Sequence, residues 1–225
     1  MKKFLVLVLS ILLILPLAGC SKSDASRFKE EYESLNGEVI NGKEIRTLNI
    51  SKKNPFVYKE AKDIVSMIKA GDTFVVYFGF ARCPWCRSIL PNLIKAADEL
   101  DIDKIYYVDV LDIRDTMDID DKGNPYKKKD ADKSYYELLN LLDGVLEDYT
   151  LTKNNKKIAT GEKRIYAPNI VVVKDGEVIN MTTGVSELQT DGYMELTDEM
   201  NNESYNKIKN NLNELNGTVC TKEGC

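Results

Sequence analysis

The feature that most constrains the fold is an apolar run that ends just before two cysteines. The run is "TFVVYFGF" over 73–80, and "CPWC" follows over 83–86. A strand that is apolar at every position is typical of a sheet with helices on both faces, because neither face meets water. Residues 84–100 have helical spacing, with Pro91 inside as a predicted kink. We therefore expect an α/β sheet and a helix that begins at the cysteine pair.

The rest of the pattern predicts further elements around this unit. Helical spacing predicts helices over 28–35, 55–69, 134–149 and 199–215, and strand patterns predict strands over 44–50 and 104–110. The stretch "APNIVVVKDGEVINMTTGV" over 167–185 predicts a hairpin with its turn at Asp175 and Gly176. Apart from its helix, the segment 111–164 is polar and loop-like.

The N-terminus predicts export and lipid attachment. Two lysines precede an apolar stretch over 4–15, which is short for a membrane span and typical of a signal peptide. A short transmembrane anchor is the alternative. "LAGC" over 17–20 resembles a bacterial lipobox, which implies cleavage before Cys20 and a lipid on its sulfur. We expect a signal peptide over 1–19 and a mature protein anchored outside the bacterial cell membrane, with 20–43 as a tether and short helix.

Composition excludes several classes of function. The chain has no histidine and a formal net charge of −5. Without imidazole there can be no Ser-His-Asp or Cys-His hydrolase and no zinc site with histidine ligands. A mildly acidic chain argues against a nucleic-acid partner, because phosphate binding needs clustered lysines and arginines. The sequence has no GxGxxG or phosphate-loop motif, and we expect no cofactor.

Lipidation of Cys20 would leave four of the five cysteines, which makes two pairs. Disulfides persist outside the cytoplasm. Cys220 and Cys225 predict a local disulfide in a C-terminal tail. The alternative is a second redox pair that exchanges electrons with Cys83 and Cys86.

Three roles are open to Cys83 and Cys86: a redox pair, zinc ligands or a structural disulfide. Backbone N–H groups and the dipole at a helix start lower the pKa of a thiol, and Arg82 and Arg87 add positive charge, unless they only solubilise the helix end. Cys86 lies one turn on and can attack a mixed disulfide at Cys83. A four-cysteine zinc site would need the C-terminal pair, whose spacing is not CxxC. A structural disulfide between Cys83 and Cys86 would close so small a loop that it would stabilise little. We favour a redox pair, without a metal.

The chain resembles thioredoxin-fold proteins over 44–110 and 166–215. The residues that carry the resemblance are "CPWC" after a buried strand, Pro91 five residues after the second cysteine, the hairpin that opens with Pro168, and Gly184 after it. The resemblance implies a central mixed sheet with helices on both faces.

The same resemblance implies a set of site residues and boundaries. Cys83 would be the nucleophile and Cys86 the resolving thiol. Pro168 would be cis and lie against the pair, and Ala167 would offer backbone hydrogen bonds to an extended substrate. We expect a thioredoxin-like domain over 44–219 with a helical insertion at about 111–164, before the cis-proline strand. A cysteine-containing tail, 220–225, would follow.

Three positions depart from the family pattern. Tyr77 stands where thioredoxins carry a buried aspartate that assists the resolving thiol, which puts efficient reduction of the cytosolic type in doubt. Pro84 and Trp85 replace a Gly-Pro dipeptide, and Arg82 replaces a common tryptophan. Together, the lipobox, CPWC and the insertion are similar to membrane-anchored thioredoxin-like lipoproteins of Gram-positive bacteria. A narrower match is to bacteriocin transport accessory proteins.

The predicted function is an extracytoplasmic thiol–disulfide oxidoreductase that acts on protein thiols and disulfides. Trp85 would touch the substrate beside Ala167 and Pro168, or would only pack. A membrane electron donor or acceptor is a reasonable partner, and the sequence leaves reductase, oxidase and isomerase open. The alternative is a non-catalytic binding or accessory lipoprotein, for example in bacteriocin export, with the insertion as its partner surface.

Overall fold

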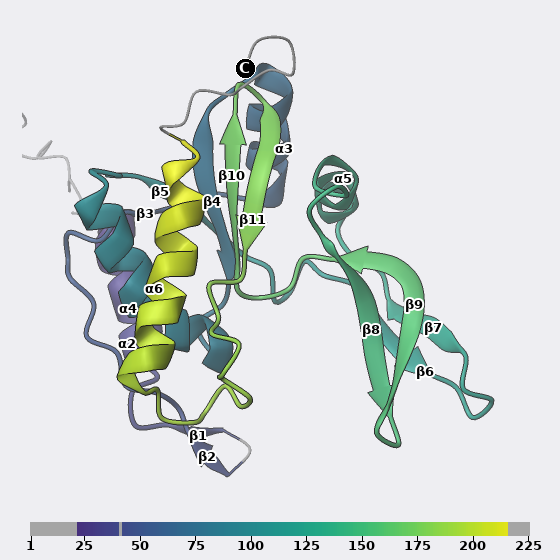
Figure 1. Cartoon of the computed structure of the whole chain (residues 1–225). Helices are drawn as coiled ribbons and strands as arrows, with labels where there is room; N and C mark the ends of the chain where they lie inside the picture. Colours follow the sequence, from purple (N-terminus) through teal and green to yellow (C-terminus); the bar gives the residue numbers. More distant parts are fainter. Residues whose placement is uncertain (1–21, 41, 216–225) are drawn as a thin grey trace, which may run out of the picture.

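The computed structural model describes residues 22–40 and 42–215 (Figure 1). Cys20, Cys220 and Cys225 lie outside these residues, so the lipid anchor, the cleaved signal peptide and the second disulfide stay predictions. Within the described ranges, no helix has the length and apolar character to cross a membrane.

A five-stranded mixed sheet lies at the centre of the α/β fold, in the order β11-β10-β4-β5-β3. Its strands are β3 (Phe56–Tyr58), β4 (Phe74–Gly79), β5 (Ile105–Asp109), β10 (Asn169–Lys174) and β11 (Glu177–Thr182). The β3, β4 and β5 strands are parallel, and β10 runs antiparallel to β4 and to β11. Every residue of β4 is buried, as its uninterrupted apolar run predicts.

Helices cover both faces of this sheet, which confirms the expected arrangement. The described helices are α2 (Asp24–Glu33), α3 (Ala61–Ala70), α4 (Pro84–Glu99), α5 (Lys133–Leu141) and α6 (Asp198–Asn213). One face carries α2, α4 and α6, with α4 and α6 packed side by side (Figure 1). The other face carries α3 and α5. The α4 helix runs through Pro91 without a break.

The strand expected over 44–50 is wrong. Only Lys43 and Glu44 are extended, as β2 (Lys43–Glu44) in a small hairpin with β1 (Val39–Ile40). Beyond it the backbone bonds to side chains at the end of α2 instead of to a strand. Leu48 donates its N–H to Asn36 Oδ1 at 3.0 Å, and Ile50 donates to Glu33 Oε1 at 2.6 Å. These bonds satisfy the backbone without a sheet partner.

The helix expected over 55–69 begins six residues late. Phe56–Tyr58 forms β3 and pairs with β5, because its aromatic and β-branched side chains suit a sheet better than a helix. A capping box between Glu60 and Asp63 then starts α3 at Ala61, and Gly71 ends it in the left-handed conformation.

The insertion, residues 111–164, is not simply helical. It contains α5 and two antiparallel hairpins, β6 (Thr116–Ile119) with β7 (Pro125–Lys129) and β8 (Glu147–Lys153) with β9 (Lys156–Arg164). The helix expected over 134–149 stops at Leu141, since residues from Glu147 onward pair with β9. The turn of that hairpin holds Asn154 and Asn155 at φ 50° and 60°, a conformation that asparagine tolerates in tight turns.

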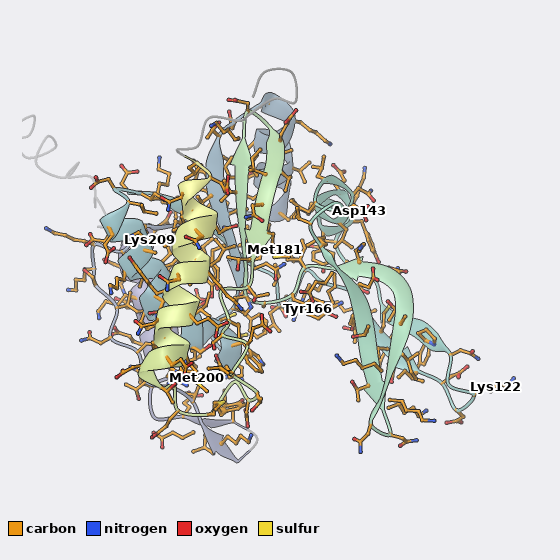
Figure 2. The ribbon with its side chains drawn as sticks, viewed as in Figure 1. Lys122, Asp143, Tyr166, Met181, Met200 and Lys209 are labelled. Carbon is orange, nitrogen blue, oxygen red and sulfur yellow. The ribbon has the colours of Figure 1, made fainter. Side chains whose placement is uncertain are left out.

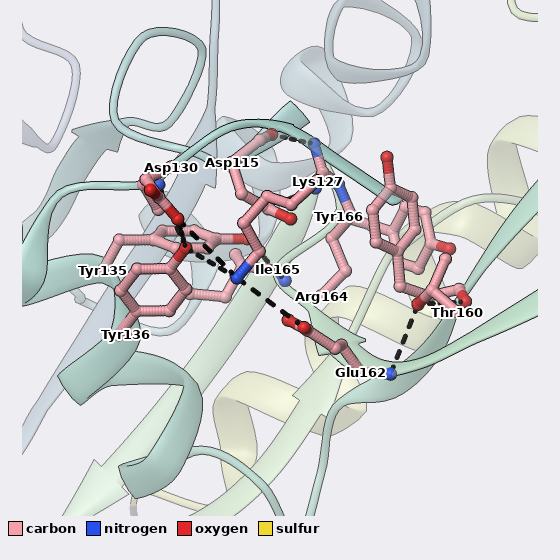
Figure 3. A network of polar contacts seen from close by, with 12 residues as sticks. Asp115, Lys127, Asp130, Tyr135, Tyr136, Thr160, Glu162, Arg164, Ile165 and Tyr166 are labelled. Carbon is pink, nitrogen blue, oxygen red and sulfur yellow. Dashed lines mark hydrogen bonds and ion pairs between the residues drawn. The ribbon is translucent and has the colours of Figure 1, made fainter. Parts of the chain in front are cut away.

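The two hairpins project from the body beside α5 (Figure 1). Figure 3 shows the polar contacts that join them to the helix. Lys127 on β7 donates to the Tyr136 hydroxyl of α5 at 3.0 Å and lies 3.6 Å from the Glu162 carboxylate of β9. Tyr166, labelled in Figure 2, lies where the chain passes from β9 to β10, and its hydroxyl donates to the Asp148 carbonyl at 3.3 Å.

The predicted hairpin after the insertion is confirmed. Strands β10 and β11 pair across a turn at Asp175 and Gly176, both with positive φ. Gly176 packs tightly on the end of α3, where an added Cβ would come within 2.6 Å of the Ile68 carbonyl oxygen. Glycine is required at that position for both reasons.

Candidate active site

The end of β4 and the start of α4 position the two cysteines. Cys83 is the N-cap of α4, and its Sγ accepts the Cys86 N–H at 3.2 Å. Pro84 occupies the first turn, where its missing N–H removes no helical hydrogen bond. The thiol of Cys83 therefore lies at the positive end of the helix, as predicted.

The environments of the two thiols differ. A hydrogen bond from the Cys86 thiol, followed by backbone N–H groups of Cys86 and Trp85 and the charge of Arg114, lowers the pKa of Cys83. Burial raises the pKa of Cys86, and the neighbouring Cys83 raises it further. Cys83 is 3% exposed and Cys86 is fully buried, and both are free thiols. The outer thiol is thus the more easily ionised of the two.

A loop far along the chain completes the site. The Cys83 thiol donates to the Ala167 carbonyl oxygen at 3.2 Å. The peptide bond between Ala167 and Pro168 is cis, as the resemblance implies. Residues 84 positions apart in sequence therefore meet at the reactive sulfur. The substrate contacts expected of Ala167 and Pro168 stay predictions.

Trp85 is half-buried and packs against the larger core cluster. The loop around Gly192 presses on the same helix start, since a Cβ at Gly192 would lie 2.9 Å from Pro84 and 3.3 Å from Trp85. Trp85 thus has a packing role, and its expected contact with substrate is not tested by these contacts.

Arg87 is fully buried and its guanidinium bonds to structural groups. Its partners are the carbonyls of Tyr32, Arg46 and Ala81 and the Asn36 side chain, at 2.7 to 3.2 Å. These bonds fasten α4 to α2 and to the chain after β2. The predicted influence of Arg82 and Arg87 on the Cys83 thiolate stays a prediction.

Arg114, in the insertion, is the cation that lowers the pKa of Cys83 in the structure, and sequence reasoning missed it. Its guanidinium lies 5.2 Å from the centre of the Phe80 ring, just before the pair. Burial, then the charge of Arg164, lowers the pKa of Arg114 itself. Arg164 in turn bonds Asp115 at 2.6 Å (Figure 3). Nothing in the spacing of 111–164 signals that this arginine returns to the cysteines.

Tyr77 faces the inner thiol. It is fully buried on β4, and its hydroxyl interacts with Cys86. Burial raises the pKa of Tyr77 well above its usual value, so the group next to the resolving thiol is a neutral phenol.

Across the ranges 22–40 and 42–215, no three His, Cys, Asp or Glu side chains are grouped so that they could hold a metal ion. A four-cysteine zinc site would also require Cys220 and Cys225, which are not described. The site as it stands offers thiol chemistry between Cys83 and Cys86.

Comparison with known proteins adds no assignment. No protein-family model matches the sequence, and no curated protein matches it.

Proposed function

We propose that this protein is a thioredoxin-fold thiol–disulfide oxidoreductase that acts on protein substrates. One observation carries the proposal. The Cys83 sulfur lies 3.2 Å from the Cys86 N–H nitrogen at a helix start and 3.2 Å from the Ala167 carbonyl oxygen, next to a cis proline. Helix start, lowered thiol pKa and a second thiol one turn away are together the requirements of a nucleophile and its resolving partner.

In the reducing direction, the Cys83 thiolate attacks one sulfur of a substrate disulfide. The substrate S–S bond breaks, a mixed disulfide forms, and the other substrate sulfur leaves as a thiolate that takes up a proton. Cys86 then loses its proton and attacks the Cys83 sulfur. The second substrate thiolate leaves, and a Cys83–Cys86 disulfide remains. Substrate oxidation is the same sequence reversed.

Substrate would lie along the chain before β10. Ala167 precedes the cis proline and is partly exposed, so its backbone is available beside the reactive sulfur. Pro168 is buried against the site and fixes the direction of that backbone. Trp85, half-exposed at the start of α4, offers an apolar contact for the side chains that flank a substrate cysteine.

The remaining parts of the proposal come from the sequence. A lipid on Cys20 would hold the enzyme at the outer face of the cell membrane, where protein thiols and disulfides are its substrates. A membrane electron donor or acceptor would reset the pair. No cofactor is needed, because thiol–disulfide exchange uses only the sulfurs.

Cysteine variants test this function. We expect Cys83→Ser to abolish disulfide exchange with a model disulfide protein, because the attacking sulfur is gone. We expect Cys86→Ala to accumulate a mixed disulfide that mass spectrometry detects, because the first step remains and the second is lost. Full exchange activity in Cys83→Ser would refute the mechanism. The reduction potential of the wild-type pair then decides the physiological direction.

The projecting hairpins favour a second candidate, a binding or accessory lipoprotein. They extend from the body beside α5 (Figure 1) and expose Tyr126 at 46% of its surface. Thiol titration separates the candidates. An acidic, alkylatable Cys83 supports the enzyme, whereas a pair inert to reductant and alkylating agent supports the binding protein.

A further inference from the structure

A row of buried tyrosines leads away from the resolving thiol. Tyr77 on β4 interacts with Cys86, and the Tyr77 and Tyr32 hydroxyl oxygens are 3.4 Å apart. Tyr32, on α2, interacts in turn with Tyr107 on β5, and their ring centroids are 6.2 Å apart. All three phenols are fully buried. Three hydroxyls, each able to donate and accept, thus follow one another through an apolar core.

The line ends at the surface. The Tyr107 hydroxyl donates to Glu31 Oε1 at 3.2 Å, and the Tyr58 hydroxyl donates to Glu31 Oε2. Glu31 is half-exposed and lines a surface pocket of about 560 Å³, together with Arg27 and Tyr58. A proton that reaches this carboxylate can therefore pass to water.

Cys86 needs such an exit. It has no exposed surface, and it must lose a proton before it attacks a mixed disulfide. Burial raises the pKa of Cys86, so direct ionisation in place is unfavourable. Its side-chain neighbour on β4 is the Tyr77 phenol. A phenol, unlike a carboxylate, does not retain an additional proton. The proton must move on.

We propose that Tyr77, Tyr32 and Tyr107 relay the proton of Cys86 to Glu31. The proposal rests on the proposed function, whose second chemical step it serves. Cys86 gives its proton to the Tyr77 oxygen, and Tyr77 gives its own hydroxyl proton to Tyr32. Tyr32 protonates Tyr107, whose proton goes to Glu31.

The balance of this step is one proton and no electrons along the chain. The Cys86 thiol becomes a thiolate, and the Glu31 carboxylate becomes an acid that releases the proton to solvent. The thiolate then attacks the Cys83 sulfur, and the bond from Cys83 to the substrate breaks. Oxidation and reduction stay among the sulfurs. In the opposite direction the same three tyrosines return a proton to Cys86.

The three phenols can pass a proton along, but they do not ionise on their own. Burial raises the pKa of Tyr77, Tyr32 and Tyr107, so each remains neutral and passes a proton only as it receives another. The Tyr32 and Tyr77 hydroxyl oxygens, 3.4 Å apart, must approach by roughly 0.6 Å to reach an ordinary O–H···O length. That movement is within the reach of two side chains.

The core makes room for the phenol beside Cys86. A Cβ on Gly79 would lie 2.6 Å from both Cζ and Oη of Tyr77, so glycine leaves the space that the hydroxyl occupies. The rings also pack: Tyr77 stacks on Tyr107 with centroids 5.7 Å apart, and Tyr32 stacks on Phe28 at 4.4 Å. Phenylalanine would keep this packing, so packing alone does not require the hydroxyls.

Other charged or titratable groups surround the line and set the field along it. Cys83 and Arg114 act on Cys86, and Arg87 interacts with Tyr32 and Tyr77. At the outer end the neighbours are Asp109, Tyr58, Arg27 and Asp24.

Tyr77→Phe tests the relay in the full-length protein. A mixed disulfide is preformed between Cys83 and a chromogenic small thiol, and its resolution by Cys86 is timed across pH. We expect resolution near neutral pH to slow by about 10- to 100-fold, since proton transfer to a positioned group contributes at least that much. The loss should shrink as pH rises, because hydroxide becomes more abundant and takes the proton whenever the buried site opens locally. Alkylation of Cys83, which precedes the relay, should keep its wild-type rate.

Tyr135→Phe is the matched control, since it removes a fully buried hydroxyl from the other face of the sheet. It should resolve the mixed disulfide at the wild-type rate. Glu31→Gln, at the surface, keeps the relay falsifiable if Tyr77→Phe does not fold, and it should slow resolution with the same pH dependence.

The outcomes separate the two proposals. The relay is overturned, and the oxidoreductase left intact, if Tyr77→Phe resolves the mixed disulfide within twofold of the wild-type rate at every pH. If Tyr77→Phe does not fold, the same result in Glu31→Gln overturns it. A wild-type protein in which Cys83 forms no mixed disulfide overturns the proposed function, and the relay with it.

Discussion

The pKa values of the two thiols, which lie three residues apart, are shifted in opposite directions. The Cys83 thiol has a lowered pKa because it caps a helix and receives hydrogen bonds, whereas burial raises the pKa of Cys86. The motif alone predicts the first of these through the helix start. Arg114 lowers the pKa of Cys83, whereas Tyr77 lowers that of Cys86 and so opposes the larger effect of burial there. Each acts through a contact that only the folded chain makes.

Replacing Arg114 tests its part in ionising Cys83. We expect Arg114→Gln to move the pH midpoint of Cys83 alkylation upward, because a nearby positive charge favours the thiolate. Alkylation at neutral pH should then slow by roughly two- to tenfold. The midpoint is measured from the ultraviolet absorbance of the thiolate.

Lys122→Gln is the control for charge. Lys122 lies at the far end of the β6–β7 hairpin in the same insertion (Figure 2), so its removal lowers the net charge equally. An equal shift in both variants would mean that overall charge, rather than Arg114, sets the thiol pKa.

At the scale of elements, the site depends on where helices and strands begin and end. The α4 helix begins directly after Cys83, and β10 begins directly after Pro168, so two element starts face each other across the reactive sulfur. The α6 helix covers the face of the sheet that α4 also covers. Its Glu203 fastens the loop after β11, bonding the Glu187 N–H at 3.0 Å and the Ser186 hydroxyl.

This fastening predicts a pH dependence of stability. The Glu187 N–H, then the Ser186 hydroxyl and Lys207, lower the pKa of Glu203 from 4.5 to about 2. A lowered folded-state pKa adds stability that is complete above the unfolded value and is lost as pH falls from about 4.5 to about 2. We expect Glu203→Gln to lower the thermal midpoint at neutral pH and to converge with wild type toward pH 2.

Glu214→Gln is a suitable control, because Glu214 is exposed at the end of the same helix. It should change the midpoint less at neutral pH. Parallel midpoint curves for Glu203→Gln and wild type over the acidic range would contradict the role given to the Glu203 carboxylate.

At the scale of the whole molecule, the sheet separates two hydrophobic clusters. One contains the cysteines, α4 and α6, and the other joins α3 to α5 of the insertion. Leu138 on α5 is fully buried in the second cluster with Ile64 of α3 and Phe78 of β4. The base of the insertion is therefore part of the core, and its two hairpins are the portion that projects.

We expect Leu138→Ala to destabilise the entire protein by about 2–5 kcal/mol, since it leaves a cavity in a shared core. Chemical denaturation followed by several probes measures this, and the probes should report one transition. Joining Thr150 to Ala159, which pair across β8 and β9, by an Asn-Gly turn is the comparison. That shortened hairpin should unfold near the wild-type midpoint. A stable Leu138→Ala protein would show that α5 is an appended element.

Elements whose sequence pattern is local could be predicted before the structure was known. The apolar run of β4, the helix that starts at Cys83 and the Asp175–Gly176 hairpin follow from periodicity and turn chemistry, and the structure has all three. The sequence pattern did not predict β3 or the strands of the insertion, because short strands such as Phe56–Tyr58 depend on a partner distant in sequence. The resemblance already implied that Ala167 and Pro168 lie by the cysteine pair, whereas the approach of Arg114 to Cys83 is visible only in the tertiary structure. Arg114, Ala167 and Tyr77 come from separate parts of the chain. Hydrogen bonds and the charge of Arg114 lower the pKa of Cys83, whereas burial raises the pKa of Cys86.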